Sequence, residues 1–489
     1  MHQSAFEPPP QRRVFCNRTL NMRSIQAVGF DMDYTLVHYD VPRWEARAYA
    51  HVQQRLLDRG HAAVRDLRFQ VDLFARGLIL DVHLGNIVKA NRFGYVIKAA
   101  HGTRMLSFDE HRKAYSQAWV DLAESRWVFL NTLFSLSEAC LYAQLVDLHD
   151  RGQLARGLGY AGIYELVRDT MDAAHLEGAL KAEIIAAPEH YVELDPDLPR
   201  ALLDLRQAGK KLFLATNSEW PYTVPMMRFA FDRFLGRGGW RDLFDLVIVQ
   251  SKKPAFFDGE APFRALDDHG NELPGEARLQ PGRCYRGGNA QALQKWLGCN
   301  GEAILYVGDH VYADVHVSSR IRRWRTALVL RELEHEVAAE QSFAGEQREL
   351  QVAMAQKERL EQEQSMLRLS LQRLEHGNPL PPTVQQNGLA SATAIHERLR
   401  GLRTEVEQLD HRIAPLAIHA SELGHPRWGP LMRSGNDKSR LARQIERYAD
   451  VYTSRVSNLL YLTPFGYLRA PRGSLPHDGH AADAPPAGH

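Results

Sequence analysis

Five short apolar segments, each followed by polar or glycine residues, are the feature that most constrains the fold. Their sequences are IQAVGF (25–30), KLFLATN (211–217), FDLVIVQ (244–250), AILYVGD (303–309) and TALVL (326–330). Continuous apolar runs of this length are typical of strands that are buried on both faces of a parallel sheet. Helix-like stretches precede most of these segments, so the alternation predicts an α/β fold with a doubly wound, Rossmann-like parallel sheet.

The chain between the first two segments is too long to be a loop, so we expect it to form a domain of its own. Residues 78–102 alternate enough to form a small β-meander, and the stretches on either side are helix-like. The sequence therefore predicts a core made of residues 12–40 and 195–333. Residues 41–194 are expected to form a large α+β cap that is inserted into this core.

The character of the sequence changes after residue 333, where long charged stretches favour helices. We expect residues 334–420 to form an antiparallel helical hairpin, because a glycine- and proline-containing break separates its two halves. Apolar residues at spacings of three and four mark the second half, namely Ile395, Leu399, Leu402, Val406, Leu409, Ile413 and Leu416. This heptad pattern suits either a solvated arm or an oligomerisation arm.

The C-terminal part divides in two. Residues 421–470 are predicted to pack back on the core, with helical spacing of the apolar residues over 443–468. Residues 471–489 lack the apolar content to fold and are predicted to be disordered.

Composition narrows the class of protein and its partners. The 489 residues include 60 basic and 59 acidic side chains, so no overall field argues for nucleic acid or an anionic membrane as a partner. No two of the four cysteines form a CxxC pair. This pattern is typical of free thiols in a reducing compartment. Neither an apolar leader nor a run of about 18 apolar residues is present, so we expect a cytoplasmic protein.

Polar residues gather where the predicted strands end, which is the edge where such sheets bind ligands. This set comprises Asp31, Asp33, Thr216, Asn217, Ser218, Lys252, Lys253, Asp309 and Asp314. Each residue alone is equally compatible with a turn, a helix cap or a solvated charge. Together, carboxylates suited to a cation and donors suited to phosphate oxygens indicate a Mg²⁺-dependent phosphoryl-transfer site.

Four motifs in these positions resemble those of the haloacid dehalogenase superfamily: DMDYT, TNS, the lysine before Pro254, and GDHVYAD. Longer matches over about residues 12–470, including FLATNSEWPYT and RYADVYTSRVSNLLY, resemble the cytosolic purine 5'-nucleotidases that prefer IMP and GMP. This resemblance implies hydrolysis of purine nucleoside monophosphates, with Mg²⁺ as cofactor. It also implies a homo-oligomer, either a dimer or a tetramer.

The resemblance assigns roles to the residues at the strand ends. Asp31 is expected to be the nucleophile and Asp33 the general acid and base. Thr216 and Asn217 are expected to donate hydrogen bonds to the phosphate, and Lys253 to neutralise it. The metal ligands are expected to be the Asp31 carboxylate, the Asp33 carbonyl and Asp309, with Asp314 completing the site.

The cap is expected to recognise the nucleotide. By position, Arg168, Asp172, His175 and Lys181 of the segment VRDTMDAAHLEGALK match the family's base and ribose contacts. The family's usual asparagine in NTLFSLSE is Ser135 here, which is shorter and lacks an amide. This departure weakens the expected base contact and keeps open a related phosphatase with another phosphomonoester substrate.

Other features of the family are less completely present. Asn131, Tyr312 and Arg320 match or conservatively replace residues of an effector nucleotide site, but Asp121 stands where the family has an arginine. An aspartyl-phosphate also permits phosphotransfer to a nucleoside in place of hydrolysis. A scaffold protein that works through its helical arm is the alternative outside the enzymes, and it predicts loss of the catalytic set. Gly287 and Gly288 are interpreted as a turn, with Asn289 as a helix cap.

Overall fold

The computed structural model describes residues 7–154, 157–176, 178–275 and 278–473. The chain divides into two compact units, which over the described residues comprise 7–334 with 431–473, and 335–430. The predicted disordered tail falls almost entirely on residues 474–489, which lie outside the described residues. Within the described part, none of the helices combines the length and the apolar character that crossing a membrane requires.

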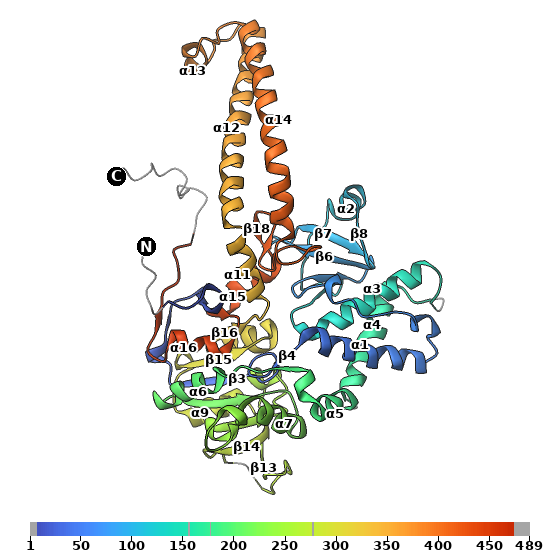
Figure 1. The fold of residues 1–489 in the computed structure, drawn as a ribbon, viewed down its shortest axis with the longest axis vertical. Helices are drawn as coiled ribbons and strands as arrows, with labels where there is room; N and C mark the ends of the chain where they lie inside the picture. Colours follow the sequence, from blue (N-terminus) through green and yellow to red (C-terminus); the bar gives the residue numbers. More distant parts are fainter. Residues whose placement is uncertain (1–6, 155–156, 177, 276–277, 474–489) are drawn as a thin grey trace. The chain divides into compact units, whose positions relative to one another are not determined.

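The first unit is built on a nine-stranded sheet with the order β1-β19-β16-β15-β3-β11-β12-β14-β13. The five predicted segments form its centre: β3 (Ala27–Phe30), β11 (Lys211–Ala215), β12 (Leu246–Val249), β15 (Ile304–Gly308) and β16 (Arg325–Val329). All five run parallel to their neighbours. The fold class predicted from the sequence, a Rossmann-like parallel sheet of haloacid dehalogenase type with an inserted cap, is confirmed (Figure 1).

The sheet is wider than predicted. Strands β14 (Arg283–Gly287) and β19 (Val451–Thr453) extend it in parallel, and β13 (Phe263–Leu266) and β1 (Val14–Cys16) close its edges in antiparallel orientation. The helix predicted over 443–468 is therefore wrong in its middle, since α15 (Arg440–Tyr448) ends before β19. Asp450 accepts a hydrogen bond from the Thr326 backbone at 2.8 Å, so pairing with β16 overrides the local helical spacing.

Alternating side chains on β11 show that both faces of the sheet are covered. Leu212 and Leu214 join the core formed with α6 (Leu198–Gln207) and α7 (Trp220–Phe231). Phe213 and Ala215 join the core formed with α8 (Ala255–Asp258), α9 (Ala290–Leu297) and α10 (Val317–Arg322). Gly29 on β3 is needed for this packing, because a Cβ there would lie 2.1 Å from the Phe213 ring. Asn289 caps α9 as predicted, accepting from the Ala292 backbone at 2.9 Å.

Residues between β3 and β11 form helices and a second sheet (Figure 1). The helices are α1 (Val41–Asp58), α2 (Phe108–Tyr115), α3 (Leu136–Asp150), α4 (Tyr160–Leu176) and α5 (Ala179–Ala186). The sheet is antiparallel, with β8 (Arg104–Met105), β7 (Val96–His101), β6 (Asn86–Ala90), β5 (Ile79–Asp81) and β9 (Trp127–Phe129) in that order. A ribbon of β4 (His38–Tyr39) and β10 (Val192–Glu193) joins the two ends of this insertion.

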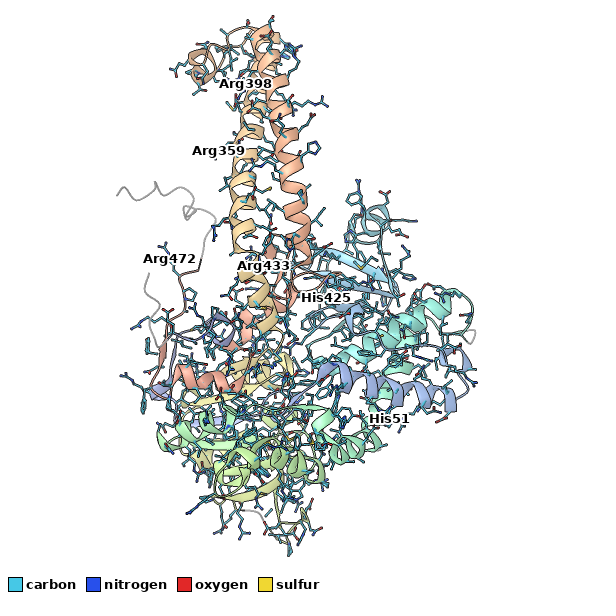
Figure 2. The ribbon with its side chains drawn as sticks, viewed as in Figure 1. His51, Arg359, Arg398, His425, Arg433 and Arg472 are labelled. Atoms are coloured by element: carbon cyan, nitrogen blue, oxygen red, sulfur yellow. The ribbon has the colours of Figure 1, made fainter. Side chains whose placement is uncertain are left out.

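The second unit contains two long helices, α12 (Ala344–Glu375) and α14 (Ala392–Glu422), with α13 (Pro382–Gln386) between them. Their ion pairs run in antiparallel order, with Glu363 bonded to Arg398 and Lys357 to Asp410. Figure 2 labels Arg359 and Arg398 on these two helices. Ile395 and Leu402 of the heptad pattern are fully buried against Leu367 of α12. The 32 residues of α12 correspond to roughly 48 Å of helix.

Candidate active site

Asp31 lies directly after the central strand β3 and is held by its backbone. Its N–H donates to the Val307 carbonyl of the neighbouring strand at 2.9 Å. The residue is 8% exposed, and its Oδ1 lies 2.8 Å from Nζ of Lys253. Strand pairing therefore fixes this carboxylate beside a cationic group at the carboxyl edge of the sheet.

Lys253 is buried between two carboxylates. Its Nζ lies 2.6 Å from Asp314 Oδ1 and donates to the Tyr306 hydroxyl at 3.1 Å. Burial alone would lower the pKa of Lys253, but Asp31 and Asp314 raise it well above its usual range. The side chain therefore stays an ammonium group at physiological pH.

Three carboxylates meet at this edge. Asp31, Asp309 and Asp314 each place an oxygen within 4.8 Å of the others, and all three are buried. Gly308 permits this approach, because a Cβ there would lie 2.5 Å from the Asp314 side chain. Burial and the neighbouring carboxylates Asp314 and Asp31 raise the pKa of Asp309 well above its usual range. Such a set of crowded oxygen donors fits a hard divalent cation.

The second aspartate of the DMD motif has different neighbours. Asp33 accepts hydrogen bonds from the Tyr39 hydroxyl at 2.5 Å and the Ser218 hydroxyl at 2.7 Å. The Tyr222 hydroxyl donates in turn to that of Tyr39 at 3.0 Å. Burial raises the pKa of Asp33, and the two hydrogen bonds oppose this rise.

Thr216 and Asn217 follow β11 and lie at the same edge, but they differ in what they contact. Thr216 is buried, and its Oγ1 accepts from the Ser218 backbone at 3.0 Å. The Asn217 amide donates to the Lys253 carbonyl at 3.0 Å, and its oxygen accepts from the Lys253 backbone at 2.6 Å. The Asn217 side chain therefore holds the backbone of Lys253 in place, which was not predicted from the sequence.

Lys181 is the residue of the predicted nucleotide contacts that lies near this edge. It extends from α5 to Glu219 Oε2 at 2.8 Å, and its Nζ lies 5.1 Å from the centre of the Tyr222 ring. Its charge also acts to lower the pKa of Asp33, against the larger effect of burial. The inserted segment therefore reaches the surroundings of the second aspartate.

The other predicted nucleotide contacts lie within the inserted segment. Arg168 and Asp172 are exposed on α4, where Tyr164 and then the charge of Asp172 raise the pKa of Arg168. Ser135 ends the short helix η5 (Leu133–Ser135), and its N–H donates to the Thr132 carbonyl at 3.3 Å. His175 belongs to α4, but its side chain lies outside the described part of the chain.

The predicted effector residues come from two parts of the chain. Tyr312 is 52% exposed, and its ring lies 5.2 Å from that of His316. Arg320 is exposed on α10, and its charge adds to burial in lowering the pKa of His316. Asn131 is half-buried and precedes η5 in the inserted segment. Asp121 is exposed. Burial lowers the pKa of Arg440, and the negative charge of Asp121 opposes this effect.

Several residues of the site escaped the sequence analysis. No local motif indicated three residues that contact the strand-end residues, namely Tyr39, Tyr306 and Arg76. The pattern of inward-facing positions on β15 is the one signal that could have indicated Tyr306. Asp40, which follows β4, caps α1 by accepting from the Arg43 backbone at 3.0 Å.

A parallel sheet with paired aspartates after its central strand, a buried lysine, an acidic cluster and an inserted cap defines a hydrolase of the haloacid dehalogenase class. The model of the 5' nucleotidase family matches residues 14–480, and the chain belongs to this family of phosphoric monoester hydrolases. It is 28% identical over 475 residues to a 5'-nucleotidase domain-containing protein of Dictyostelium discoideum, covering 95% of this chain and 74% of that protein.

Solved structures with lower similarity include two enzymes. An archaeal beta-phosphoglucomutase from Pyrococcus sp. strain ST 04 aligns with 62% of this chain and 86% of its own, at 11% identity and a TM-score of 0.29. A 2-haloacid dehalogenase from Pseudomonas syringae pv. Tomato DC3000 aligns with 62% and 86%, at 14% identity and a TM-score of 0.22.

Proposed function

We propose that this protein is a Mg²⁺-dependent 5'-nucleotidase that hydrolyses purine nucleoside 5'-monophosphates of the IMP and GMP type. The observation that carries the proposal is the buried contact of Lys253 with Asp31 and Asp314, beside Asp309. A cation bound by Asp31, the Asp33 carbonyl and Asp309, with Asp314 in support, would neutralise these carboxylates and the phosphate. The all-oxygen donor set and the raised pKa of Asp309 support this assignment.

In the first step, an Asp31 carboxylate oxygen attacks phosphorus and the bond between phosphorus and the ribose 5'-oxygen breaks. Lys253 holds the Asp31 carboxylate in place at 2.8 Å and offers positive charge to the transferring group. Asp33 gives its proton to the leaving oxygen, a role that suits a carboxyl group whose pKa burial has raised. Thr216 supplies a hydroxyl at the same edge for the phosphate oxygens.

In the second step, Asp33 takes a proton from water, and the water oxygen attacks phosphorus. The bond between phosphorus and the Asp31 oxygen breaks, which releases phosphate and restores the carboxylate. A nucleoside 5'-hydroxyl in place of water would give phosphotransfer. The ratio of the two products with and without added inosine measures this second activity.

We assign nucleotide recognition to the inserted segment, residues 41–194, and the chemistry to the core formed by 12–40 and 195–333. Arg168, Asp172, His175, Lys181 and Ser135 are the proposed contacts of base and ribose. The position of Lys181 beside Tyr222 and Glu219 supports this assignment, because it joins the insertion to the strand ends. We also propose that residues 334–420 form a helical arm. Residues 421–470 are proposed to pack back on the core.

Purine preference is tested by kcat/KM for inosine, guanosine, adenosine and pyrimidine monophosphates. We expect the oxo-purines to be preferred, because the Arg168 donors match an oxo-purine edge. The shorter Ser135 is expected to make this preference modest. Equal values across the panel would refute purine recognition and favour a phosphatase for another phosphomonoester.

Regulation and assembly are further parts of this proposal. The approach of Tyr312 and Arg320 to His316 supports an effector site, and acceleration by ATP at low substrate is the expected result. If ATP leaves the rate unchanged, the proposed effector site is wrong. We also propose a homo-oligomer, dimer or tetramer, which light scattering tests. The four free cysteines support a reducing, cytoplasmic location.

A further inference from the structure

Arg76 is a buried arginine of the inserted segment that reaches the strand ends. It lies between η4 (Val71–Leu73) and β5, and it is only 3% exposed. Arginine is seldom buried this completely unless its charge is paired. Its position is fixed by the next residue, because the Gly77 N–H donates to the Leu130 carbonyl at 2.7 Å.

The guanidinium group bridges two neighbouring parallel strands. Nη1 donates to the Asp309 carbonyl at 3.3 Å, directly after β15. Nη2 donates to Glu332 Oε2 at 2.7 Å, just after β16. One side chain of the insertion therefore holds the ends of both strands together.

Asp309 has a second contact with the insertion. The Thr132 hydroxyl donates to Asp309 Oδ2 at 3.4 Å, and its oxygen accepts from the Phe134 backbone at the start of η5. The carbonyl and the carboxylate of Asp309 are thus both contacted from residues 76–132. Two contacts at opposite ends of one residue restrict how its carboxylate can turn.

The charge of Arg76 alone would disfavour a nearby cation, so its effect on the cation site must be weighed. Glu332 forms an ion pair with it and largely cancels the charge seen from a distance. What remains is the orientation of Asp309. Losing a hydrogen bond from a charged donor changes the preference for one orientation over another by about tenfold or more.

We propose that Arg76 is a positioning residue that holds Asp309 in the orientation needed to bind the divalent cation, so that metal affinity depends on the inserted segment. This inference rests on the proposed function, which places the cation at Asp309. Arg76 touches neither the phosphate nor the cation in this account. It acts through the Asp309 backbone.

The test measures metal binding directly, without substrate or turnover. Mn²⁺ is titrated into the full-length protein and free Mn²⁺ is followed by electron paramagnetic resonance. We expect Arg76→Met to weaken Mn²⁺ binding about tenfold or more, because it removes both hydrogen bonds and keeps the apolar stem. Arg76→Lys is expected to recover part of the affinity, since an ammonium group can still donate to the carbonyl.

Arg47→Ala is the matched control. Arg47 is a partly exposed arginine of α1 that pairs with Glu183. Glu183 also contacts His51 of the same helix. Its Mn²⁺ affinity is expected to equal that of the unchanged protein. Thermal unfolding of each variant is recorded alongside, because a purely structural role for Arg76 would lower the melting temperature without changing affinity.

Equal Mn²⁺ affinity in the unchanged protein and in folded Arg76→Met would overturn the inference while leaving the proposed function intact. If Arg76→Met does not fold, Arg76→Gln decides, because its shorter neutral side chain lacks the charged donor, and unchanged affinity there has the same meaning. Failure of the unchanged protein to bind Mn²⁺ would instead overturn the proposed cofactor, and the inference with it.

Discussion

Two aspartates separated by one residue have different surroundings, and this difference divides their proposed roles. Asp31 faces the ammonium group of Lys253 at 2.8 Å. Asp33 faces two neutral hydroxyls, from Tyr39 and Ser218. Burial raises the pKa of both carboxyl groups, that of Asp31 to about 7. Lys253 opposes this rise at Asp31 and so favours the ionised nucleophile, whereas Asp33 has neutral donors and is able to carry a proton.

Tyr39→Phe should reduce kcat about 10- to 100-fold with little change in KM. The change removes a hydrogen bond to Asp33 and leaves the aromatic packing in place. Steady-state kinetics with the preferred nucleotide measure it. Tyr142→Phe is the control, because the buried Tyr142 hydroxyl has no hydrogen-bond partner among the described residues. Equal kinetics for both variants would contradict a positioning role for Tyr39.

Glu45→Gln should make the protein less sensitive to alkaline pH. Burial raises the pKa of Glu45 to about 7, so the folded protein holds a proton there that the unfolded chain releases near pH 4.5. The free energy of unfolding therefore falls as pH rises from about 4.5 to 7, and the loss is complete above pH 7. Glutamine keeps an acceptor for the Ser137 N–H but carries no charge.

Urea unfolding of the two proteins at pH 5 and pH 8 measures this effect. We expect the variant to gain about 2–3 kcal/mol relative to the unchanged protein between these values. Glu189→Gln, at an exposed position, is expected to show no such gain. If the free energy of unfolding changes with pH in the same way in Glu45→Gln and in the unchanged protein, the raised pKa of Glu45 is contradicted.

The strand-end residues could be predicted because each follows an apolar run, and parallel strands bring their carboxyl ends to one edge. The contacts of Asn217 with Lys253 and of Arg76 with Asp309 could not be predicted in this way. They join residues 36 and 233 positions apart, and no local pattern records such a distance. The sequence thus indicates which chemical groups gather, and the tertiary fold decides which of them position the others.

At the scale of elements, long and strongly patterned segments were predictable and short ones were not. The central strands β3, β11, β12 and β15 lie within predicted apolar runs, and β16 begins one residue before its run, at Arg325. β19 has three residues and was predicted as helix, since the aromatic and apolar residues around it also fit helical spacing. Its strand conformation comes from pairing with β16 and β1, which the local sequence does not specify.

Leu402→Ala should destabilise the helical hairpin by about 2–5 kcal/mol, because Leu402 is fully buried in the seam between α12 and α14. Urea unfolding followed by circular dichroism at 222 nm measures the loss. Leu369→Ala removes the same atoms from a position that is 40% exposed, so little change is expected there. If both variants unfold alike, the heptad seam does not stabilise the hairpin.

At the scale of the whole molecule, the insertion reaches the catalytic edge at several points. Lys181 reaches Glu219 beside the Asp33 network, and Arg76 and Thr132 reach Asp309. The antiparallel pairing of β4 with β10 adds a further connection at the two ends of the insertion, and β4 carries Tyr39. The insertion is therefore more than a lid over the proposed site, because its residues contact the groups that are proposed to perform the chemistry.

The central claim is that Asp31 and a divalent cation together hydrolyse nucleoside monophosphates. The measurement that tests it most directly is phosphate release from a nucleotide and sugar-phosphate panel, with Mg²⁺ and with EDTA, for the unchanged protein and for Asp31→Asn. We predict release from purine nucleoside monophosphates with Mg²⁺, none with EDTA, and none from a folded Asp31→Asn protein. Equal release by Asp31→Asn, or no release from any substrate by the unchanged protein, would contradict the account.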